Sequence, residues 1–346
     1  MKAAVFKQRG QPLVIEAVPD PAPLANELLL KVAACGICGT DLHWSEYEIP
    51  EGTWRTLAPG SVMGHEFAGE VVEVGRDLKG QWKVGDRVCA QPPLGCGRCP
   101  ACLAGRSYRC QRVMTRASNK LTGAYAEFTR VGAAETLRLP ESVDYDLGAL
   151  VEPLAVGLAA VRRARLSQGD AVLIVGGGPV GLSVALWCRF FGARHVIVSD
   201  LVRARAERAT EFGATAAIDA TKEDVAARAK QIAGEAPSIV FDCVGVPGSM
   251  QLTIDYAPNY ARIVVVGLCM AQDSFFPARA IMKELDLSFA FVYTKADFEF
   301  VIEMLGRERI DPAGLVTDHV GFDGFSAAFE ALKRPSGQIK VLLRPD

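Results

Sequence analysis

The segment Val172–Gly181 constrains the fold of this chain most strongly. It reads Val-Leu-Ile-Val followed by Gly-Gly-Gly-Pro-Val-Gly, which is an apolar strand, a glycine turn and the start of a helix. In this context the Gly-x-Gly-x-x-Gly pattern is typical of a dinucleotide-binding βαβ unit. Gly176 allows the tight turn, Gly178 lets the backbone approach a pyrophosphate, and Gly181 allows the helix to pack closely on the strand.

The residues after the glycines indicate which dinucleotide is bound. Pro179 and Val180 open the helix, whose N-terminal N–H groups attract the pyrophosphate. Asp200 ends the next strand, 19 residues after the last glycine of the motif, where a carboxylate accepts hydrogen bonds from the adenine ribose. This favours NAD. Arg205, like Arg203, follows the carboxylate and is a candidate for a 2′-phosphate contact, but the alternative is the solvated face of the next helix.

The rhythm of apolar strand, glycine turn and alanine-rich helix recurs from about residue 150 to residue 289. Such alternation predicts a parallel sheet. Residues 1–139 instead contain short β-rich segments cut by glycine and proline, which favours a partly open β-barrel. Helices near Asp297–Leu305 and Phe325–Arg334 and a final strand are expected to return to the first domain. We therefore predict an α/β chain with a barrel domain (residues 1–150 and 290–346) and a doubly wound parallel-sheet domain (residues 151–289).

Charge and composition argue against several classes of partner. The 346 residues have a formal net charge of −2, which gives no overall attraction to nucleic acid or an anionic membrane. No apolar run approaches the roughly 20 residues of a membrane span, and the N-terminus lacks the apolar core of a signal peptide. Ten cysteines in such a chain favour metal ligands and buried thiols over disulfides. We expect a cytoplasmic protein with a small-molecule substrate.

A cluster of four cysteines predicts a structural zinc site in a glycine- and proline-rich lobe at about residues 94–112. The spacing is Cys-x2-Cys-x2-Cys-x7-Cys, and the members are Cys96, Cys99, Cys102 and Cys110. Four thiolates can surround one Zn²⁺ tetrahedrally and leave no open position. This metal is expected to hold the lobe together and to do no chemistry.

Four other cysteines and two histidines are interpreted as structural. Cys89, Cys188, Cys243 and Cys269 lie in apolar sequence and are expected to be buried thiols in strands or helices. His195 is expected to open a strand, and His319 to lie in a C-terminal loop.

A second group of polar residues spans three short motifs, Cys35-Gly-Ile-Cys38-Gly-Thr40-Asp41-Leu-His43, Gly64-His65-Glu66 and Val151-Glu152-Pro153. Together with GHEFAGEVVEVG, VGDRV, the four-cysteine lobe, VEPLAVGL and the glycine turn, they make the chain resemble the zinc-containing medium-chain dehydrogenases over essentially its full length. The resemblance implies a GroES-like catalytic domain, a Rossmann cofactor domain, NAD and two Zn²⁺ per subunit.

The resemblance makes Cys38 and His65 ligands of a catalytic zinc, with Glu152 where some relatives have a cysteine. Relatives of the polyol, butanediol and threonine branch also use the glutamate after the histidine, here Glu66, as a ligand or by exchange with water. The sequence leaves open which carboxylate is bound. A thiolate, an imidazole and a carboxylate leave a fourth position for water or the substrate oxygen. Cys35 matches a family cysteine that does not bind this metal.

Thr40 and His43 are three residues apart and would share one face of a helical turn. In the family the matching residues relay the alcohol proton to solvent through a cofactor ribose hydroxyl. The alternative is that Thr40 caps the helix and His43 packs. Asp41 is expected to orient a histidine ligand.

The resemblance also implies further cofactor and substrate contacts. Val266 and Leu268 bound the nicotinamide cleft, Val244 lies near the ribose, and Lys340 approaches the pyrophosphate. The substrate pocket is expected to be wide, aromatic and apolar, with an interface or core role as the alternative for some members. Its candidates are Trp44, Tyr47, Trp54, Leu121, Leu268, Phe291 and Tyr293.

These features predict zinc-dependent, reversible hydride transfer between a secondary alcohol and NAD. Polyol or butanediol dehydrogenase and L-threonine 3-dehydrogenase are the alternatives within the family. A zinc-free reductase of the same superfamily would lack the catalytic ligands, and a non-enzymatic zinc protein would leave the cofactor motif unexplained. A homotetramer is the family expectation for assembly, with a dimer as the alternative.

Overall fold

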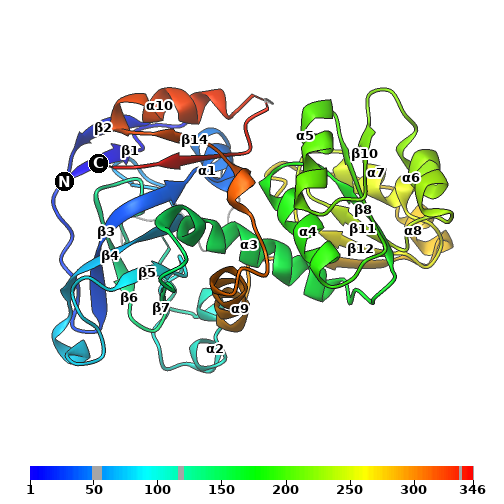
Figure 1. Cartoon of the computed structure of the whole chain (residues 1–346). Coiled ribbons are helices and arrows are strands. Elements are labelled where there is room, and N and C mark those ends of the chain that lie inside the picture. The colour runs from blue at the N-terminus through cyan, green and yellow to red at the C-terminus, as the bar shows by residue number, and fades with distance from the viewer. Residues whose placement is uncertain (49–56, 116–120, 335–336, 346) are drawn as a thin grey trace.

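A six-stranded parallel sheet forms one half of the molecule in the computed structural model, which describes residues 1–48, 57–115, 121–334 and 337–345 (Figure 1). The strands lie in the order β10 (Ala216–Asp219), β9 (His195–Asp200), β8 (Ala171–Val175), β11 (Ile239–Asp242), β12 (Arg262–Val265) and β13 (Asp286–Phe289). All five residues of β8 are buried, as expected for a strand covered on both faces. The strand order reverses beside β8, where doubly wound sheets bind their ligands.

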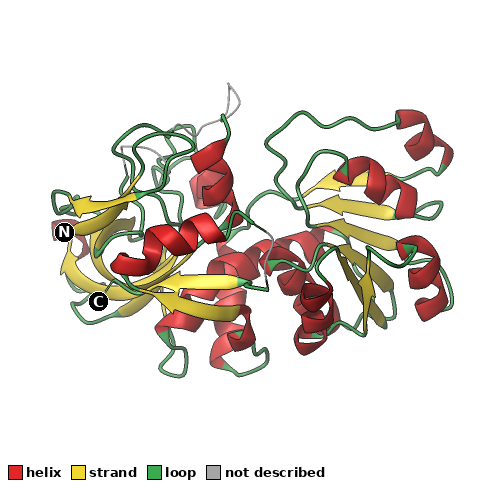
Figure 2. Ribbon diagram, turned by 90° about the horizontal axis from the view of Figure 1, so that it is seen from above, coloured by secondary structure: helices red, strands yellow, loops and turns green. Residues whose placement is uncertain are grey.

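Helices flank both faces of this sheet (Figure 2). They are α4 (Pro179–Phe190), α5 (Arg203–Arg208), α6 (Val225–Ala233), α7 (Ser249–Tyr256) and α8 (Pro277–Met282). The predicted parallel sheet with alternating helices is thereby confirmed.

The other half is a mostly antiparallel, barrel-like sheet. Its strands are β14 (Val316–Val320), β15 (Lys340–Leu343), β3 (Glu27–Gly36), β4 (Glu66–Val74), β5 (Arg87–Ala90) and β7 (Thr136–Arg138), with β6 (Phe128–Gly132) on β3. A hairpin of β1 (Lys2–Val5) and β2 (Val14–Ala17) and the helix α10 (Phe322–Ala331) pack beside it. Two short helices, α1 (Gly39–Glu46) and α2 (Pro100–Leu103), carry candidate site residues.

A long helix, α3 (Tyr145–Arg163), connects the two halves (Figure 1). It begins at Asp144, whose side chain accepts a hydrogen bond from the Leu147 amide, the usual way to satisfy a free N–H at a helix start. α3 packs against β4 of the barrel and against α4 of the parallel-sheet half. The predicted boundary between residues 150 and 151 falls inside this unbroken helix.

The C-terminal region confirms two predicted helices and corrects one residue. α9 (Lys295–Gly306) and α10 lie where helices were expected, and β15 is the final strand. His319 does not lie in a loop. It belongs to β14, which pairs in parallel with β15, and its Nε2 lies 2.7 Å from Asp146 Oδ2. The short strand was missed because its sequence, Val-Thr-Asp-His-Val, carries three charged or polar residues at its centre.

The predicted positions of His195 and of the four cysteines outside the metal motifs are right for some residues and wrong for others. His195 opens β9, Cys89 lies in β5, and Cys188 lies in α4. Cys243 follows directly after β11 and Cys269 lies in a partly exposed loop, so the predicted placement in a strand or helix is wrong for both. None of the described helices is long and apolar enough to cross a bilayer.

Candidate active site

Three potential metal ligands come together where α1 meets the start of β4. Cys38 immediately precedes α1, His65 precedes β4, and Glu66 is the first residue of that strand. Their ligand atoms all lie within 4.8 Å of one another. One thiolate, one imidazole and one carboxylate are a donor set that suits Zn²⁺ and leaves room for another ligand. The residues therefore fit a catalytic zinc.

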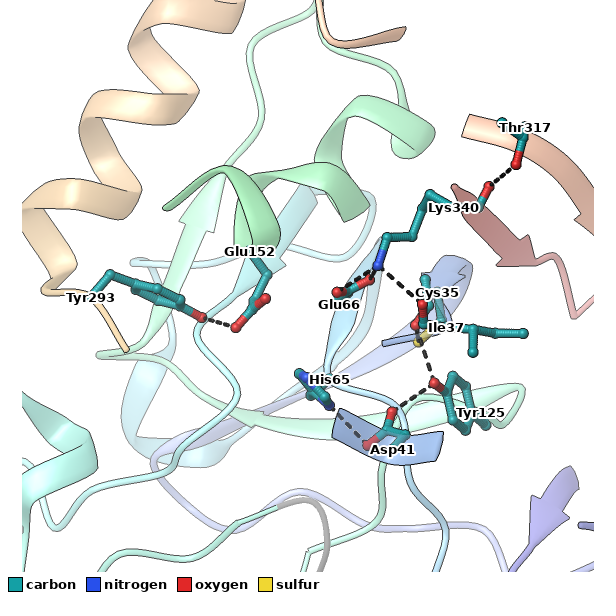
Figure 3. Close-up of polar contacts among 11 residues, drawn as sticks. Cys35, Ile37, Asp41, His65, Glu66, Tyr125, Glu152, Tyr293, Thr317 and Lys340 are labelled. Carbon is teal, nitrogen blue, oxygen red and sulfur yellow. Dashed lines mark hydrogen bonds and ion pairs between the residues drawn. The ribbon is translucent and has the colours of Figure 1, made fainter. Parts of the chain in front are cut away.

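Asp41 and Tyr125 hold the imidazole of His65 (Figure 3). Asp41 is fully buried, and its Oδ1 lies 3.2 Å from His65 Nδ1. The Tyr125 hydroxyl donates to the other carboxylate oxygen at 2.6 Å. Burial disfavours the imidazolium, but Asp41 and the Cys38 thiolate outweigh it and raise the pKa of His65. With Nδ1 facing Asp41, Nε2 is the nitrogen left for a metal.

Tyr125 connects this group to the C-terminal helix. Its ring centroid lies 4.8 Å from that of Phe325 and 6.3 Å from that of Phe329, both on α10. Gly64 makes this position possible, because a Cβ there would lie only 2.6 Å from the tyrosine ring. Burial, followed by the negative charge of Asp41, raises the pKa of Tyr125, so its hydroxyl stays a hydrogen-bond donor.

Glu66 forms a buried ion pair with Lys340 (Figure 3). Lys340 Nζ donates to Glu66 Oε2 at 2.6 Å, to Oε1 at 2.8 Å and to the Ile37 carbonyl at 3.0 Å. Both side chains are 2% exposed. Burial disfavours the ammonium, but Glu66 outweighs it and raises the pKa of Lys340. The predicted approach of Lys340 to a pyrophosphate is therefore corrected: its three N–H groups are used inside the protein.

Glu152 lies on α3, on the other side of His65 from Asp41 (Figure 3). The Tyr293 hydroxyl donates to Glu152 Oε1 at 2.9 Å. Part of Glu152 remains open to solvent, but the surrounding protein removes most of its hydration, and this burial raises the pKa of its carboxyl to about 7. The charges of His65 and Glu66 also act on this carboxyl, although Glu152 is not among the three donors that lie within 4.8 Å of one another.

The four cysteines of the lobe also converge. The sulfur atoms of Cys96, Cys99, Cys102 and Cys110 all lie within 4.8 Å of one another. Backbone N–H groups lower the pKa of Cys96 to about 6, whereas burial and neighbouring thiols raise the pKa of Cys102 to about 12. Four thiolates at this spacing fit a closed tetrahedral Zn²⁺ site. All ten cysteines of the chain are free thiols.

The glycine turn connects β8 to α4 as the motif requires. Gly176 has φ +101°, which glycine adopts readily. A Cβ on Gly178 would meet nothing within 4 Å, whereas one on Gly181 would lie 1.8 Å from the Gly176 carbonyl oxygen. Asp200 accepts hydrogen bonds from the Gly177 and Val202 amides, both at 2.7 Å. The carboxylate is therefore fixed beside the turn.

The remaining candidates for cofactor contacts lie on several different elements. Pro179 and Val180 open α4, and a Cβ on Gly176 would lie 3.1 Å from Val244. Val266 follows β12. Arg205 donates to the Gln338 carbonyl at 3.4 Å.

The predicted relay and substrate residues lie in different environments. Thr40 and His43 are on α1. Trp44 is buried, with its ring 6.2 Å from His65, and the exposed Tyr47 lies 5.9 Å from His43. Leu121 is buried and Leu268 is exposed, while Trp54 lies outside the described residues.

Two aromatic candidates make specific contacts with other parts of the protein. Phe291 is exposed and packs edge-on against Tyr108 of the cysteine lobe, with ring centroids 6.2 Å apart. Tyr293 is almost fully buried, and its hydroxyl is occupied by Glu152. Phe291 thus connects the loop after β13 to the lobe, and its place in the substrate pocket stays a prediction.

Sequence reasoning missed two partners of the site. Tyr125 was not considered, because it lies 84 residues from Asp41 in a strand-like segment. The pairing of Lys340 with Glu66 spans 274 residues and depends on β15 lying beside β3. Neither pair leaves a signal in local spacing.

A zinc-type donor set and a dinucleotide-binding glycine turn in one chain define a zinc-type dehydrogenase, and comparisons with known proteins agree. Residues 24–141 match the model of the alcohol dehydrogenase GroES-like domain, and residues 179–307 match that of zinc-binding dehydrogenases. The chain is 33% identical to sorbitol dehydrogenase of Bacillus subtilis (strain 168) over 350 residues, covering 100% of this chain and 98% of the relative.

Two further relatives extend the comparison. The chain is 33% identical to L-threonine 3-dehydrogenase of Aeromonas hydrophila subsp. hydrophila over 333 residues, 95% of each chain. A zinc-binding dehydrogenase of Sinorhizobium meliloti 1021, solved bound to NADP, superposes with a TM-score of 0.86 at 28% identity over 99% of both chains. The chain belongs to the zinc-containing medium-chain dehydrogenases. The predicted family, its GroES-like and Rossmann folds and its oxidoreductase class are confirmed.

Proposed function

We propose that this chain oxidises a secondary alcohol reversibly with NAD, at a zinc held by Cys38, His65 and Glu152. The observation that carries the proposal is the convergence of the Cys38, His65 and Glu66 donors, with Glu152 on the other side of His65 (Figure 3). Both oxygens of Glu66 accept hydrogen bonds from Lys340. We therefore assign Glu152 as the carboxylate ligand at rest and Glu66 as the carboxylate that exchanges with water or substrate.

The side chains around the metal position the reacting groups and move the proton. When bound, zinc supplies the Lewis acidity that brings the pKa of a hydroxyl group toward neutrality. Asp41 fixes the tautomer of His65. Thr40 and His43, one helical turn apart on α1, relay the released proton toward solvent. Burial lowers the pKa of His43, so its imidazole is neutral at pH 7 and able to accept that proton.

NAD is the proposed cofactor in preference to NADP. Asp200 is held at the end of β9 by two amide hydrogen bonds, and a fixed carboxylate repels a 2′-phosphate. Arg205, the candidate for that phosphate, is engaged by the Gln338 carbonyl. The Sinorhizobium meliloti relative was solved with NADP bound, so NADP is the competing cofactor. The ratio of kcat/KM with NAD to kcat/KM with NADP tests the preference.

The aromatic surroundings favour a neutral, medium-sized substrate. Trp44 and Tyr47 lie next to His65 and His43, and Leu268 bounds the proposed nicotinamide cleft. The buried carboxylates Asp41 and Glu66 are already paired, so neither is available for the ammonium group of threonine. A polyol or threonine substrate is the second candidate, because sorbitol and threonine dehydrogenases are 33% identical to this chain.

Two metals per subunit, self-association and a reducing compartment complete the proposal. The four-cysteine lobe fits the second, structural zinc, and ten free thiols support the cytoplasm. β13 is an edge strand that carries an exposed Phe289, near the exposed Ile281 and Met282 of α8. An exposed apolar edge supports a dimer contact, within the homotetramer that we propose.

The domain boundaries at residues 150 and 290 stay a prediction.

The test is NADH formation with a panel of secondary alcohols, vicinal diols, polyols and L-threonine, repeated with NADP and after chelation. We expect the highest kcat/KM with an alkyl or aryl secondary alcohol and NAD, and loss of turnover on chelation. A higher kcat/KM with a polyol or with threonine would favour the second candidate, a polyol or threonine dehydrogenase. Turnover that survives removal of the catalytic metal would contradict the ligand assignment.

A further inference from the structure

The segment Phe291–Lys295 lies between the cysteine lobe and Glu152. Its central residue, Tyr293, is 2% exposed and donates its hydroxyl hydrogen to Glu152 Oε1 at 2.9 Å (Figure 3). The Tyr293 ring stacks on Phe298 of α9, with centroids 5.3 Å apart. Because a carboxylate group is rigid, a hydrogen bond that fixes one of its oxygens also restricts the direction in which the other oxygen points.

The cysteine lobe grips this segment on both sides of Tyr293. Before it, the Phe291 ring packs against Tyr108, which lies between the third and fourth cysteines of the lobe. After it, the Lys295 amide donates to the Gly105 carbonyl of the lobe at 3.0 Å, while Lys295 Nζ donates to the Ala134 carbonyl, outside the lobe, at 2.8 Å. Displacement of the lobe would therefore shift the backbone on either side of the tyrosine.

The backbone between these contacts is strained. Val292 has φ +58°, a left-handed conformation that is uncommon for a β-branched residue. Such a conformation persists only where the surrounding structure imposes it, and it is found most often at functional sites. Directly after Tyr293, Thr294 and Asp297 form a capping box that starts α9. The strained turn directs Tyr293 inward, while Phe291 points to the lobe.

We infer that Tyr293 is a positioning residue that orients Glu152 toward the catalytic metal, and that the four-cysteine lobe sets the place of Tyr293. This rests on the proposed role of Glu152 as a zinc ligand. The lobe would then affect the catalytic site as well as its own stability. Its contacts with Phe291 and Lys295 fix the segment that carries Tyr293, and the Tyr293 hydroxyl fixes Glu152. In this inference Tyr293 acts on the metal through its hydrogen bond to Glu152.

The test compares three single variants with the wild type. Tyr293→Phe removes only the hydroxyl, Glu152→Gln removes the proposed ligand charge, and Tyr260→Phe is the control, because Tyr260 is 72% exposed on the parallel-sheet half. The readouts are retention of the catalytic metal against a competing chelator and the visible spectrum of enzyme with Co²⁺ at that site. The spectrum reports ligand geometry, which a merely structural role would not change.

We expect Tyr293→Phe to weaken catalytic-metal binding by about 10- to 100-fold, as is typical when a partner of a metal ligand is removed, and to shift the cobalt spectrum. Tyr260→Phe should match the wild type, and Glu152→Gln should bind metal more weakly still. If Glu152→Gln loses metal while Tyr293→Phe retains it with an unchanged spectrum, the inference fails and the proposed function stands. If Glu152→Gln also retains metal like the wild type, the ligand assignment itself fails.

The contribution of the lobe is tested with Phe291→Leu, which removes the ring contact with Tyr108 but none of the cysteines. We expect a cobalt shift in the same direction as for Tyr293→Phe and smaller, with the structural zinc retained. A spectrum identical to the wild type would overturn the part assigned to this contact. A lobe variant such as Cys102→Ser is less informative, because loss of the structural metal can unfold the lobe.

Discussion

Replacing Lys340 by methionine should destabilise the protein strongly. The ammonium group makes three hydrogen bonds, two of them to Glu66, and both side chains are 2% exposed. Lys340→Met removes the positive charge at nearly constant volume and leaves a buried carboxylate without its partner. Removing one partner of a buried ion pair typically lowers the free energy of unfolding by about 3 to 5 kcal/mol. Because both side chains of this pair are almost fully buried, we expect a loss in that range.

The assay is urea unfolding at fixed protein and zinc concentrations, because metal and assembly both shift the apparent stability. The matched control is Lys7→Met, since Lys7 pairs with Glu16 at 2.5 Å on the surface, where such pairs contribute up to about 1 kcal/mol. A double variant, Lys340→Met with Glu66→Leu, replaces both buried charges by apolar groups. It should recover most of the loss, since no unpaired charge remains.

A loss below about 1 kcal/mol for Lys340→Met, the value of an exposed pair, would refute this reasoning. Excess zinc should reduce the loss, because the released Glu66 carboxylate lies with Cys38 and His65 in one donor cluster. A loss that is the same at trace and at excess zinc would show that Glu66 does not reach the metal even when Lys340 is absent.

Three further perturbations test other parts of the site. Tyr125→Phe should cost about 1 to 3 kcal/mol in urea unfolding, because the Asp41 carboxylate loses a buried donor; an unchanged midpoint would contradict the hydrogen bond. Burial lowers the pKa of His43, so the part of the acidic fall in kcat that comes from protonation of this imidazole should lie below pH 6.5, the unperturbed value. His43→Gln should abolish that acidic limb in a pH–rate profile, and a limb that persists would exclude His43 as its origin. Gly181→Ala places a Cβ 1.8 Å from the Gly176 carbonyl and should cost about 1 to 3 kcal/mol as an overpacked contact and weaken NADH binding in a fluorescence titration; wild-type affinity and stability would be inconsistent with this packing.

Features written in local sequence could be predicted. The run of β8 into the glycine turn and the four-cysteine lobe each occupy fewer than about 20 consecutive residues, and the chemistry of glycine and cysteine limits the alternatives. β14 was missed because its pattern is polar at the centre, and the inward position of Tyr293 depends on the left-handed backbone at Val292. Propensity rules do not anticipate such a residue, since tertiary contacts impose it.

Features that depend on distant segments could not be predicted from spacing. Glu66 meets Lys340 across 274 residues, and Tyr293 meets Glu152 across 141. The family resemblance supplied the ligand positions but assigned Lys340 to a phosphate, because a basic side chain in sequence does not reveal which anion it meets. Only the fold shows that the nearest anion is Glu66.

The long helix α3 has a mechanical consequence. It is helical without interruption from Tyr145 to Arg163, yet it contains Pro153 directly after Glu152. Proline removes one backbone hydrogen bond and is the commonest place for a helix to bend. Because α3 packs against both halves of the molecule, any rotation of one half against the other would bend the chain beside Glu152 or beyond the ends of the helix. A bend at Pro153 would also move Glu152, so the position of this carboxylate depends on the straightness of α3.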